Sequence, residues 1–366
     1  MSKTTIEQLG EVGQSVWLDY ISRSLLKSGR LKELIALGIT GMTSNPTIFD
    51  KAINSGSDYD DHIRELHNKG NVLFAIYDDI TIKDIQDAAD IFRPTYDKTK
   101  GLDGYVSLEI NPKLAYDTQE TIEEGKRLAA KVNRPNVMFK VPATDAGFAA
   151  ISALLAEGIN VNVTLIFSLE QYEKTAAAYV EGVTGLLKNK GDARSIRSVA
   201  SVFVSRIDTA VDKLLDQLQE EEAASLKGKA AVANSNLIYQ AYREIFSGDP
   251  FKGMEKQGAS VQRVLWGSTG TKNPAYSDIK YMAELIARDT VNTVPENTLE
   301  AFLDHGVVKE ALTAEADDAQ GIITVLQRLG IDINAVCTKL LEDGVIAFEQ
   351  SFDSLLHAIE KKTQSM

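Results

Sequence analysis

Lys140 is the residue with the clearest chemical potential in this sequence, because it lies inside the apolar run VMFKVPA at positions 137–143. Lysine is almost never fully buried without a partner. Burial favours the neutral amine of a lysine, and a neutral amine can attack a carbonyl carbon to form a Schiff base. A structural ion pair with Glu109 is the alternative, since such networks also perturb ionisation. The spacing alone leaves both interpretations open.

Two carboxylates could serve the proton transfers that Schiff-base chemistry requires. Asp19 lies in VWLDYI at 16–21, and Glu109 lies in YVSLEI at 105–110, so each is flanked by apolar residues. Carboxylates on different strands could act as acid and base around a carbinolamine. A helix cap or a surface ion pair is the alternative for each, and the apolar neighbours argue against it.

Polar side chains in other apolar segments could bind the hydroxyls of a sugar. They are Asn45 in MTSNPTIF, Asn162 and Thr164 in NVNVTLIF, and Ser201 in SVASVFVS. An amide or a hydroxyl is a poor core residue because it needs a hydrogen-bond partner once it leaves water. Backbone groups could equally supply that partner, so each residue alone is a weak signal.

Basic and hydroxyl side chains that follow two later segments could bind a phosphate. Arg206 comes directly after VFVS, and Ser268 and Lys272 lie in GSTGTKNP at 267–274. Loop amides and basic side chains bind phosphate at the corresponding place in many α/β barrels. The stretch does not match a nucleotide P-loop, which would read GxxxxGK followed by Ser or Thr. A polar turn is the alternative.

The charge balance excludes several classes of partner. The 366 residues carry a formal net charge of −13, and no long basic run offsets it. This argues against binding to nucleic acid or to an anionic membrane. The sequence also has no apolar stretch of about 18 residues and no signal-peptide core at its start, so we expect a cytoplasmic protein.

Metal and disulfide chemistry are not expected. The four histidines, at positions 62, 67, 305 and 357, lie outside the strand-like segments, and HIRELH lacks the spacing of a two-histidine zinc helix. We expect them on surface helices. Cys337 is the one cysteine and cannot form an internal disulfide.

Eight segments with a two-residue period must position these side chains. Each alternates an apolar face with a polar or bulky face, which is typical of a β-strand. The predicted strands are 16–21, 37–44, 105–110, 136–143, 160–167, 198–205, 263–269 and 289–294. On this prediction the candidate residues from Asp19 to Ser201 point inward near one end of the sheet.

Helical patterns separate the strands, most clearly at 116–132, 146–158 and 168–187. Strand followed by helix, repeated eight times over roughly 250 residues, predicts an α/β fold of the (β/α)8 TIM barrel type. The alternative is an open doubly wound sheet. Such a sheet tends to have continuous apolar strands and a Gly-rich loop after the first strand, and neither is present.

Two predicted helical insertions, around 58–92 and from 211 to Arg263, interrupt the alternation of strands and helices. Beyond about residue 312, apolar residues recur near helical spacing at Val336, Leu340, Val345, Phe348, Phe352, Leu355 and Ile359. We therefore predict one domain over 1–366, with roughly 312–366 as a C-terminal helical extension packed on the barrel.

The motifs together resemble the transaldolase family. GMTSNPTIF is similar to the family's first signature and VMFKVPATDAG to its second, which surrounds the Schiff-base lysine. VWLDYISRSLL, VSLEINP, NVNVTLIFS, SVFVSRID and LWGSTGTKNPAY extend the likeness over most of residues 10–310. The chain resembles the longer bacterial branch, which has a helical C-terminal extension.

The resemblance implies transfer of a dihydroxyacetone unit from sedoheptulose 7-phosphate to glyceraldehyde 3-phosphate, a reaction of the pentose phosphate pathway that gives erythrose 4-phosphate and fructose 6-phosphate. It implies no cofactor and no metal. Lys140 would form the Schiff base, Glu109 and Thr164 would hold and activate water, and Asp19 would move the proton of the C4 hydroxyl.

The resemblance also implies the substrate contacts. Asn45, Asn162 and Ser201 would hold the dihydroxyacetone hydroxyls, and Arg206 would bind the phosphate. In the commoner family pattern a Ser and an Arg sit close together in the strand-seven loop, whereas here Ser268, Thr269 and Lys272 are spaced differently.

Two other functions remain open on the sequence. A fructose 6-phosphate aldolase would use the same lysine but release free dihydroxyacetone; chain length and Phe203 argue against it, because the related aldolases carry a tyrosine at the matching place. A non-catalytic sugar-phosphate-binding barrel is opposed by the set of Asp19, Glu109 and Lys140. The sequence leaves the oligomeric state open, including a homo-oligomer.

Overall fold

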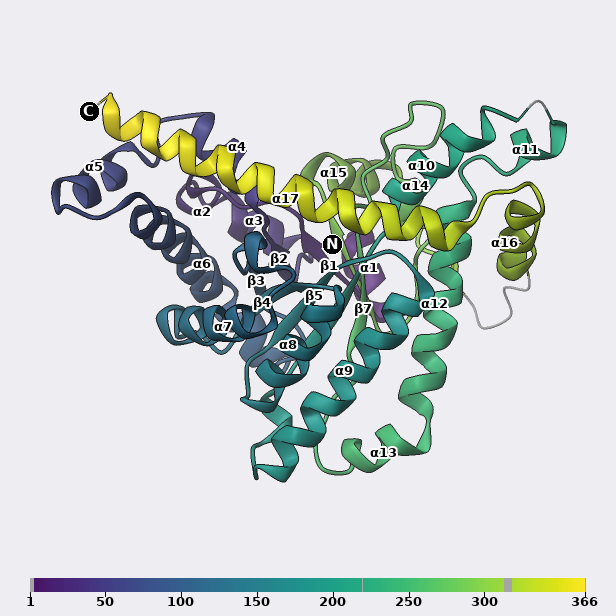
Figure 1. Cartoon of the computed structure of the whole chain (residues 1–366), viewed down its shortest axis with the longest axis horizontal. Helices are drawn as coiled ribbons and strands as arrows, with labels where there is room; N and C mark the ends of the chain where they lie inside the picture. Colours follow the sequence, from purple (N-terminus) through teal and green to yellow (C-terminus); the bar gives the residue numbers. More distant parts are fainter. Residues whose placement is uncertain (1–2, 219, 313–317, 366) are drawn as a thin grey trace.

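Eight parallel strands close into a barrel in the computed structural model, which describes residues 3–218, 220–312 and 318–365 (Figure 1). Each strand pairs with the next along the chain, and β8 pairs with β1. The strands are β1 (Gln14–Leu18), β2 (Gly41–Thr43), β3 (Val106–Glu109), β4 (Val137–Pro142), β5 (Val161–Ile166), β6 (Ser198–Phe203), β7 (Arg263–Gly267) and β8 (Thr290–Val294). The predicted TIM barrel is confirmed.

Helices connect the strands and surround the barrel. Before β3 these are α1 (Thr5–Val12), α2 (Arg23–Lys27), α3 (Arg30–Ala36), α4 (Pro46–Asn54), α5 (Asp60–Asn68) and α6 (Leu73–Lys98). Between β3 and β6 they are η1 (Pro112–Leu114), α7 (Thr118–Val132), α8 (Asp145–Ala156), α9 (Leu169–Lys188) and η2 (Ala193–Ser195). After β6 they are α10 (Ser205–Leu215), α11 (Glu221–Ser225), α12 (Ala230–Ser247), α13 (Asp249–Glu255), α14 (Lys280–Ala283) and α15 (Glu296–His305).

The strand register aligns the candidate catalytic residues. Glu109 on β3 lies opposite Lys140 on β4, and Lys140 lies opposite Asn162 on β5. Residues that are directly opposite each other in neighbouring strands point to the same face of a sheet. The three side chains therefore share one face of the barrel wall, as the two-residue period predicted.

All eight predicted strands are confirmed with shifted ends, and two of them, 16–21 and 37–44, differ from the observed strands by three or more residues at one end. The segment 37–44 was expected to be one strand, but β2 contains only Gly41–Thr43. Leu37 and Gly38 instead close α3, and Gly38 adopts φ +113°, a left-handed conformation that a glycine takes without strain. β1 begins at Gln14 rather than Val16 because Gln14 already pairs with Thr290 of β8.

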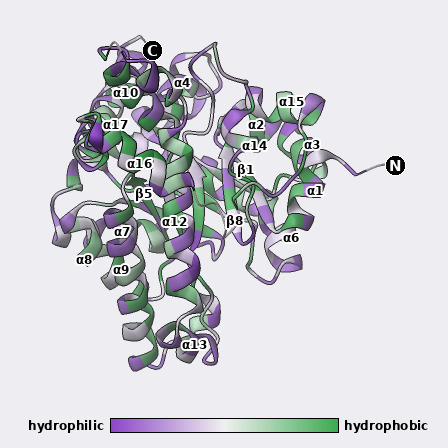
Figure 2. Ribbon diagram, turned by 90° about the vertical axis from the view of Figure 1, so that its right-hand side faces the viewer, coloured by the Kyte–Doolittle hydropathy of each residue, from purple (hydrophilic) through white to green (hydrophobic). Residues whose placement is uncertain are grey.

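The buried apolar residues form two layers. Inside the barrel, Trp17, Met138 and Leu265 belong to a small cluster that also contains Tyr105, Val199 and Val291. A much larger cluster lies between the strands and the helices. Figure 2 shows hydrophobic residues on the central strands and hydrophilic residues on the outer sides of the helices. These two apolar layers hold in place the strands that carry the candidate site residues.

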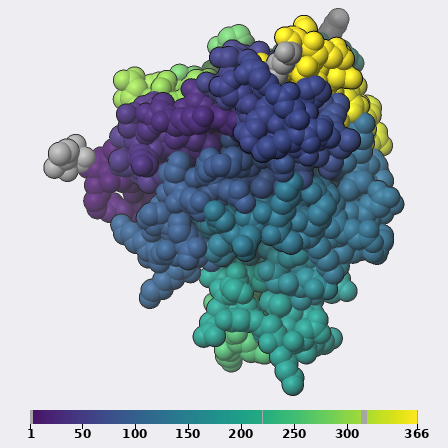
Figure 3. Space-filling model, turned by 90° about the vertical axis from the view of Figure 1, so that its left-hand side faces the viewer, coloured from purple at the N-terminus to yellow at the C-terminus, as the bar shows by residue number. Residues whose placement is uncertain are grey.

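The chain ends in two helices, α16 (Asp318–Arg328) and α17 (Ile333–Gln364). Within the predicted extension, residues 313–317 and 366 lie outside the described residues. α17 runs across the molecule beside α4, and its far end lies next to α5 (Figures 1 and 3). Hydrogen bonds from Thr47 to Ser351, at 2.7 Å, and from Ser354 to Asp50, at 3.0 Å, join α17 to α4.

Candidate active site

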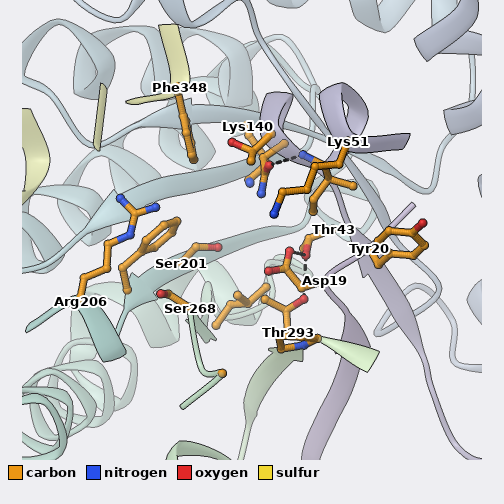
Figure 4. A pocket seen from close by; sticks show the side chains of 18 of the residues that line it. Asp19, Tyr20, Thr43, Lys51, Lys140, Ser201, Arg206, Ser268, Thr293 and Phe348 are labelled. Carbon is orange, nitrogen blue, oxygen red and sulfur yellow. Dashed lines mark hydrogen bonds between the residues drawn. The ribbon is translucent and has the colours of Figure 1, made fainter. Parts of the chain in front are cut away.

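A cavity of about 590 Å³ lies at the carboxyl ends of the strands, where active sites of such barrels form (Figure 4). Strand ends and the loops after them supply most of its wall, and α17 supplies Phe348. Eight of the predicted site residues line the cavity: Asp19, Asn45, Lys140, Ser201, Phe203, Arg206, Ser268 and Lys272. Glu109, Asn162 and Thr164 are buried residues of the neighbouring strand ends.

Lys140 is almost fully buried, yet its amine makes few hydrogen bonds. Its Nζ donates to the backbone oxygen of Ser44 at 3.0 Å and lies 3.1 Å from Oε2 of Glu109. The side chains of Lys140 and Glu109 are 5 % and 6 % exposed. The approach to Glu109 is close enough for an ion pair, but Oε2 has no aligned hydrogen-bond donor among the described residues. Removing both groups from water costs free energy that this single contact offsets only in part.

The surroundings of Glu109 suit a carboxyl group that exchanges protons. Burial raises the pKa of Glu109 above the ordinary carboxyl value, and the nearby Lys140 charge opposes this shift. A carboxyl group with a raised pKa can accept and return a proton at a higher pH than a free carboxyl group. Glu109 therefore lies where its carboxylate can accept a proton from the Lys140 amine or from a water bound next to that amine.

Asp19 lies directly after β1, and two hydroxyl groups order it. Its Oδ1 accepts a hydrogen bond from Thr43 at 2.8 Å, and the Thr43 hydroxyl lies 2.7 Å from that of Thr293. Burial raises the pKa of Asp19, while the charge of Lys140 and the Thr43 hydrogen bond lower it. Figure 4 shows Asp19 and Thr43 at the cavity floor. A carboxyl group here could take a proton from a substrate hydroxyl.

Asn45 is positioned by the start of α4. Its side-chain oxygen accepts a hydrogen bond from the backbone N–H of Ile48 at 3.0 Å, which caps the helix, and Pro46 occupies the first helical turn. Both features are preferred at helix starts. The cap uses the amide oxygen of Asn45, which leaves the amide nitrogen for a ligand. The polar TSNP turn thus connects β2 to α4 and places Asn45 in the cavity wall.

Asn162, Ser201 and Ser107 are joined by side-chain hydrogen bonds beside the cavity. The hydroxyl of Ser201 donates to the amide oxygen of Asn162 at 2.6 Å, and the amide nitrogen donates to the Ser107 hydroxyl at 3.0 Å. These bonds fix the rotamers of all three side chains. Ser201 also lines the cavity, so its hydroxyl oxygen is available to accept a hydrogen bond from a ligand.

Thr164 sits where β5 becomes irregular. The register with β6 shifts between Val163 and Ile166, and Leu165 adopts φ +58°, which is unusual for a residue other than glycine. The Thr164 hydroxyl is buried and has no hydrogen-bond partner among the described residues. A buried hydroxyl without a partner is costly, so it is a candidate to bind a water or a substrate oxygen.

Two cations lie at the cavity edge beyond β6 and β7. Burial lowers the pKa of Arg206, and burial together with the charge of Arg206 lowers the pKa of Lys272. Neither residue forms an ion pair with a carboxylate in the described part of the chain. Nearby cations that repel each other and lack a carboxylate suit an anion such as phosphate. Ser268, at φ +53°, lies beside them and its hydroxyl is 3.1 Å from that of Ser205.

Several residues of the cavity wall were not predicted from the sequence. Thr43, Lys51, Thr293 and Phe348 line the cavity but were not predicted as site residues. Thr43 was detectable, since it follows the same apolar run as Asn45. Phe348 was recognised as an apolar position of the last helix, but local pattern could not show that this helix crosses the barrel mouth.

The described residues contain no group of three or more His, Cys, Asp or Glu side chains that could hold a metal ion. Within the same residues, no helix combines the length and apolar character that crossing a bilayer requires. His67, His305 and His357 are exposed on helices. His62 is half-buried, and its ring nitrogen lies 3.3 Å from the Arg23 guanidinium.

Comparisons with known proteins place the chain in one family. Residues 16–359 match the family model described as transaldolase/fructose-6-phosphate aldolase. A protein named transaldolase from Mycobacterium ulcerans is 45% identical, with 100% of this chain and 98% of that protein covered. A transaldolase from Saccharopolyspora erythraea is 45% identical over 99% of this chain and 98% of its own. One from Mycobacterium tuberculosis is 46% identical over 95% of this chain and 94% of its own.

Proposed function

The chain belongs to the transaldolase/fructose-6-phosphate aldolase family, and we propose that it is a transaldolase of the pentose phosphate pathway. It transfers a dihydroxyacetone unit from sedoheptulose 7-phosphate to glyceraldehyde 3-phosphate and gives erythrose 4-phosphate and fructose 6-phosphate. The observation that carries the proposal is the enclosure of Lys140 against Glu109, in a cavity that is also lined by Asp19 and by the cations Arg206 and Lys272.

The proposed reaction begins with attack of the Lys140 amine on the ketone carbon of the donor sugar. Glu109, with the free hydroxyl of Thr164, holds the water that the carbinolamine loses. Asp19 takes the proton of the C4 hydroxyl while the C3–C4 bond breaks. The first aldose then leaves, and the three-carbon unit remains on Lys140 as an enamine. Reversal of these steps on the acceptor aldehyde completes the transfer.

The substrate is held at both ends in this proposal. Asn45, Asn162 and Ser201 bind the hydroxyls of the dihydroxyacetone unit. Arg206 binds the phosphate, with Lys272 and Ser268 beside it. The two neighbouring cations at the cavity edge, Arg206 and Lys272, support phosphorylated sugars as substrates. The proposal also includes a cytoplasmic location, which rests on the sequence features described above.

Fructose 6-phosphate aldolase is the second candidate, because the family contains it. It shares the lysine but releases dihydroxyacetone. Phe203 argues for the transferase: it is buried, its ring lies 5.6 Å from that of Phe167, and the Arg206 guanidinium lies 5.3 Å from its centre. An apolar ring at this place offers no hydrogen bond to a hydrolytic water.

One experiment tests both the nucleophile and the activity. The protein is incubated with fructose 6-phosphate and borohydride, which reduces a Schiff base to a stable amine, and peptides are mapped by mass. We expect one adduct, on Lys140. In parallel, fructose 6-phosphate and erythrose 4-phosphate are supplied together, and both sedoheptulose 7-phosphate and free dihydroxyacetone are measured. An adduct on another residue, or dihydroxyacetone as the main product, would overturn the proposal.

A further inference from the structure

The last helix forms part of the active-site wall. Phe348 of α17 lines the same cavity as Lys140 and is 5 % exposed. The centre of its ring lies 6.0 Å from Nζ of Lys140. Figure 4 shows the ring pointing into the cavity between Lys140 and Arg206. The barrel strands supply polar groups around the amine together with the ring of Phe203, and α17 adds a second apolar ring from outside the barrel.

The position of α17 is fixed from several sides. Hydrogen bonds from Ser351 and Ser354 hold it to α4, and the ion pair of Lys113 with Asp353, at 2.6 Å, holds it next to η1. At Gly344 the helix approaches the end of β5 so closely that an added Cβ would lie 2.9 Å from Cδ2 of Leu165. Phe348 is one turn further along the helix, so its ring is placed over the cavity by contacts on both sides of it.

A transferase must protect its intermediate from water. After the C3–C4 bond breaks, the three-carbon unit remains on Lys140 as an enamine. In transfer, C3 of the enamine bonds to the aldehyde carbon of the acceptor, and the aldehyde oxygen takes a proton. In release, C3 takes the proton instead, and one water hydrolyses the iminium to dihydroxyacetone and the free amine.

We propose that α17 determines the ratio of transfer to release, because Phe348 excludes water from the Lys140 adduct. The proposal rests on the transaldolase function proposed above and adds a positioning residue from outside the barrel. An aromatic ring within about 6 Å also favours a cation at Nζ, so it suits the iminium that the donor ketose forms with Lys140 before the C3–C4 bond breaks. The C-terminal helix thus belongs to the reaction and not only to the stability of the fold.

The test compares Phe348→Leu and Phe348→Ala with Phe352→Leu in the full-length protein. Phe352 is the matched control: it lies one turn along the same face of α17, is buried, and packs edge-on against Tyr77 with ring centres 5.1 Å apart, but it does not line the cavity. Each variant receives fructose 6-phosphate and erythrose 4-phosphate. The readout is free dihydroxyacetone released per sedoheptulose 7-phosphate formed, which does not depend on the fraction of folded protein.

We expect release per transfer to rise about tenfold in Phe348→Ala, to rise less in Phe348→Leu, and to stay unchanged in Phe352→Leu. An unchanged ratio in both Phe348 variants, or an equal rise in Phe352→Leu, would overturn the role of Phe348. If the wild-type protein gives neither transfer nor a borohydride adduct on Lys140, the proposed function itself fails. If Phe348→Ala does not fold, Phe348→Leu decides the question.

Discussion

The two ends of the barrel each contain a buried pair of a basic residue and a carboxylate, and the pairs differ in how well they are satisfied. At the amino end, Arg263 of β7 lies 3.0 Å from Asp103, and both side chains are 8 % exposed. At the carboxyl end, Lys140 and Glu109 are buried to a similar degree. The two pairs therefore face a similar desolvation cost in different surroundings.

The pair at the amino end has hydrogen-bond partners on both sides. Asp103 accepts from Ser15 at 2.7 Å and from Trp17 at 3.2 Å, while Arg263 donates to Ser15 at 2.8 Å and to the backbone oxygen of Leu102 at 2.6 Å. At the carboxyl end, Oε2 of Glu109 has no aligned hydrogen-bond donor in the part of the chain that the structure describes. A buried charge without a full set of hydrogen-bond partners is costly. We therefore expect a ligand to complete the hydrogen bonds of Lys140 and Glu109 at the carboxyl end of the barrel.

The largest expected effect is at Lys140. Lys140→Met removes the proposed nucleophile, and we expect activity to fall by at least about four orders of magnitude. The fold should be weakened less than in Arg263→Met, because Glu109, whose pKa is raised, can take up a proton and remain neutral. Transfer assays and urea unfolding midpoints check both statements. An active Lys140→Met protein would contradict the Schiff-base mechanism.

Arg263→Met is the matched change at the other end. It leaves Asp103 charged in a buried position, and we expect unfolding to become easier by about 3–5 kcal/mol. The specific activity of the folded fraction should remain close to that of the wild type, since Arg263 does not line the cavity of Lys140. A large loss of activity without a loss of stability would contradict a structural role for the pair at the amino end.

Glu109→Gln sharpens the comparison through pH. Burial raises the pKa of both Glu109 and Asp19, and each must be ionised to accept a proton. The logarithm of kcat/KM in the wild type should therefore fall with a slope approaching 2 as pH decreases through these raised values. In Glu109→Gln we expect a slope of 1 and a rate lower by about 10²- to 10⁴-fold.

The control for this measurement is Glu181→Gln, which changes an exposed carboxylate on α9. It should leave both the slope and the rate unchanged. A wild-type slope of 1 that persists in Glu109→Gln would assign the titration to a single group other than Glu109.

The smallest expected effect concerns the phosphate. Arg206→Ala removes a charge-assisted contact, and we expect KM for phosphorylated sugars to rise roughly 10- to 100-fold with little change for unphosphorylated ones. Lys213→Ala is the control, because Lys213 lies on the same helix but not in the wall of the Lys140 cavity. Equal losses on both substrate types, or an equal effect of Lys213→Ala, would contradict a phosphate site at Arg206.

The sequence predicted the carboxyl end of the barrel better than the rest. A period of two residues is enough to place Glu109, Lys140 and Asn162 on one face, and the register confirms it. The roles of these residues stay predictions. The predicted length of β2 was wrong, because the turn at Gly38 lies inside an apolar run whose pattern indicates a strand.

Contacts between distant elements could not be predicted. Asp103 lies in a polar turn, and nothing near it in the sequence indicates that Arg263, 160 positions later, will pair with it. Phe348 has the spacing of an ordinary buried helix residue. Its place beside Lys140 depends on how α17 docks across α4, and local pattern carries no information about that docking.

The closure of the barrel by β1 and β8 has a consequence for how the protein is made. Gln14 and Thr290, which are hydrogen-bonded across this seam at 2.9 Å, are 276 positions apart in the chain. Contacts between such distant residues form slowly, because a long loop must be ordered first. Thr293 and Phe348, which complete the wall around Lys140, come later still along the chain. A growing polypeptide therefore cannot enclose the amine until nearly all of it has been synthesised.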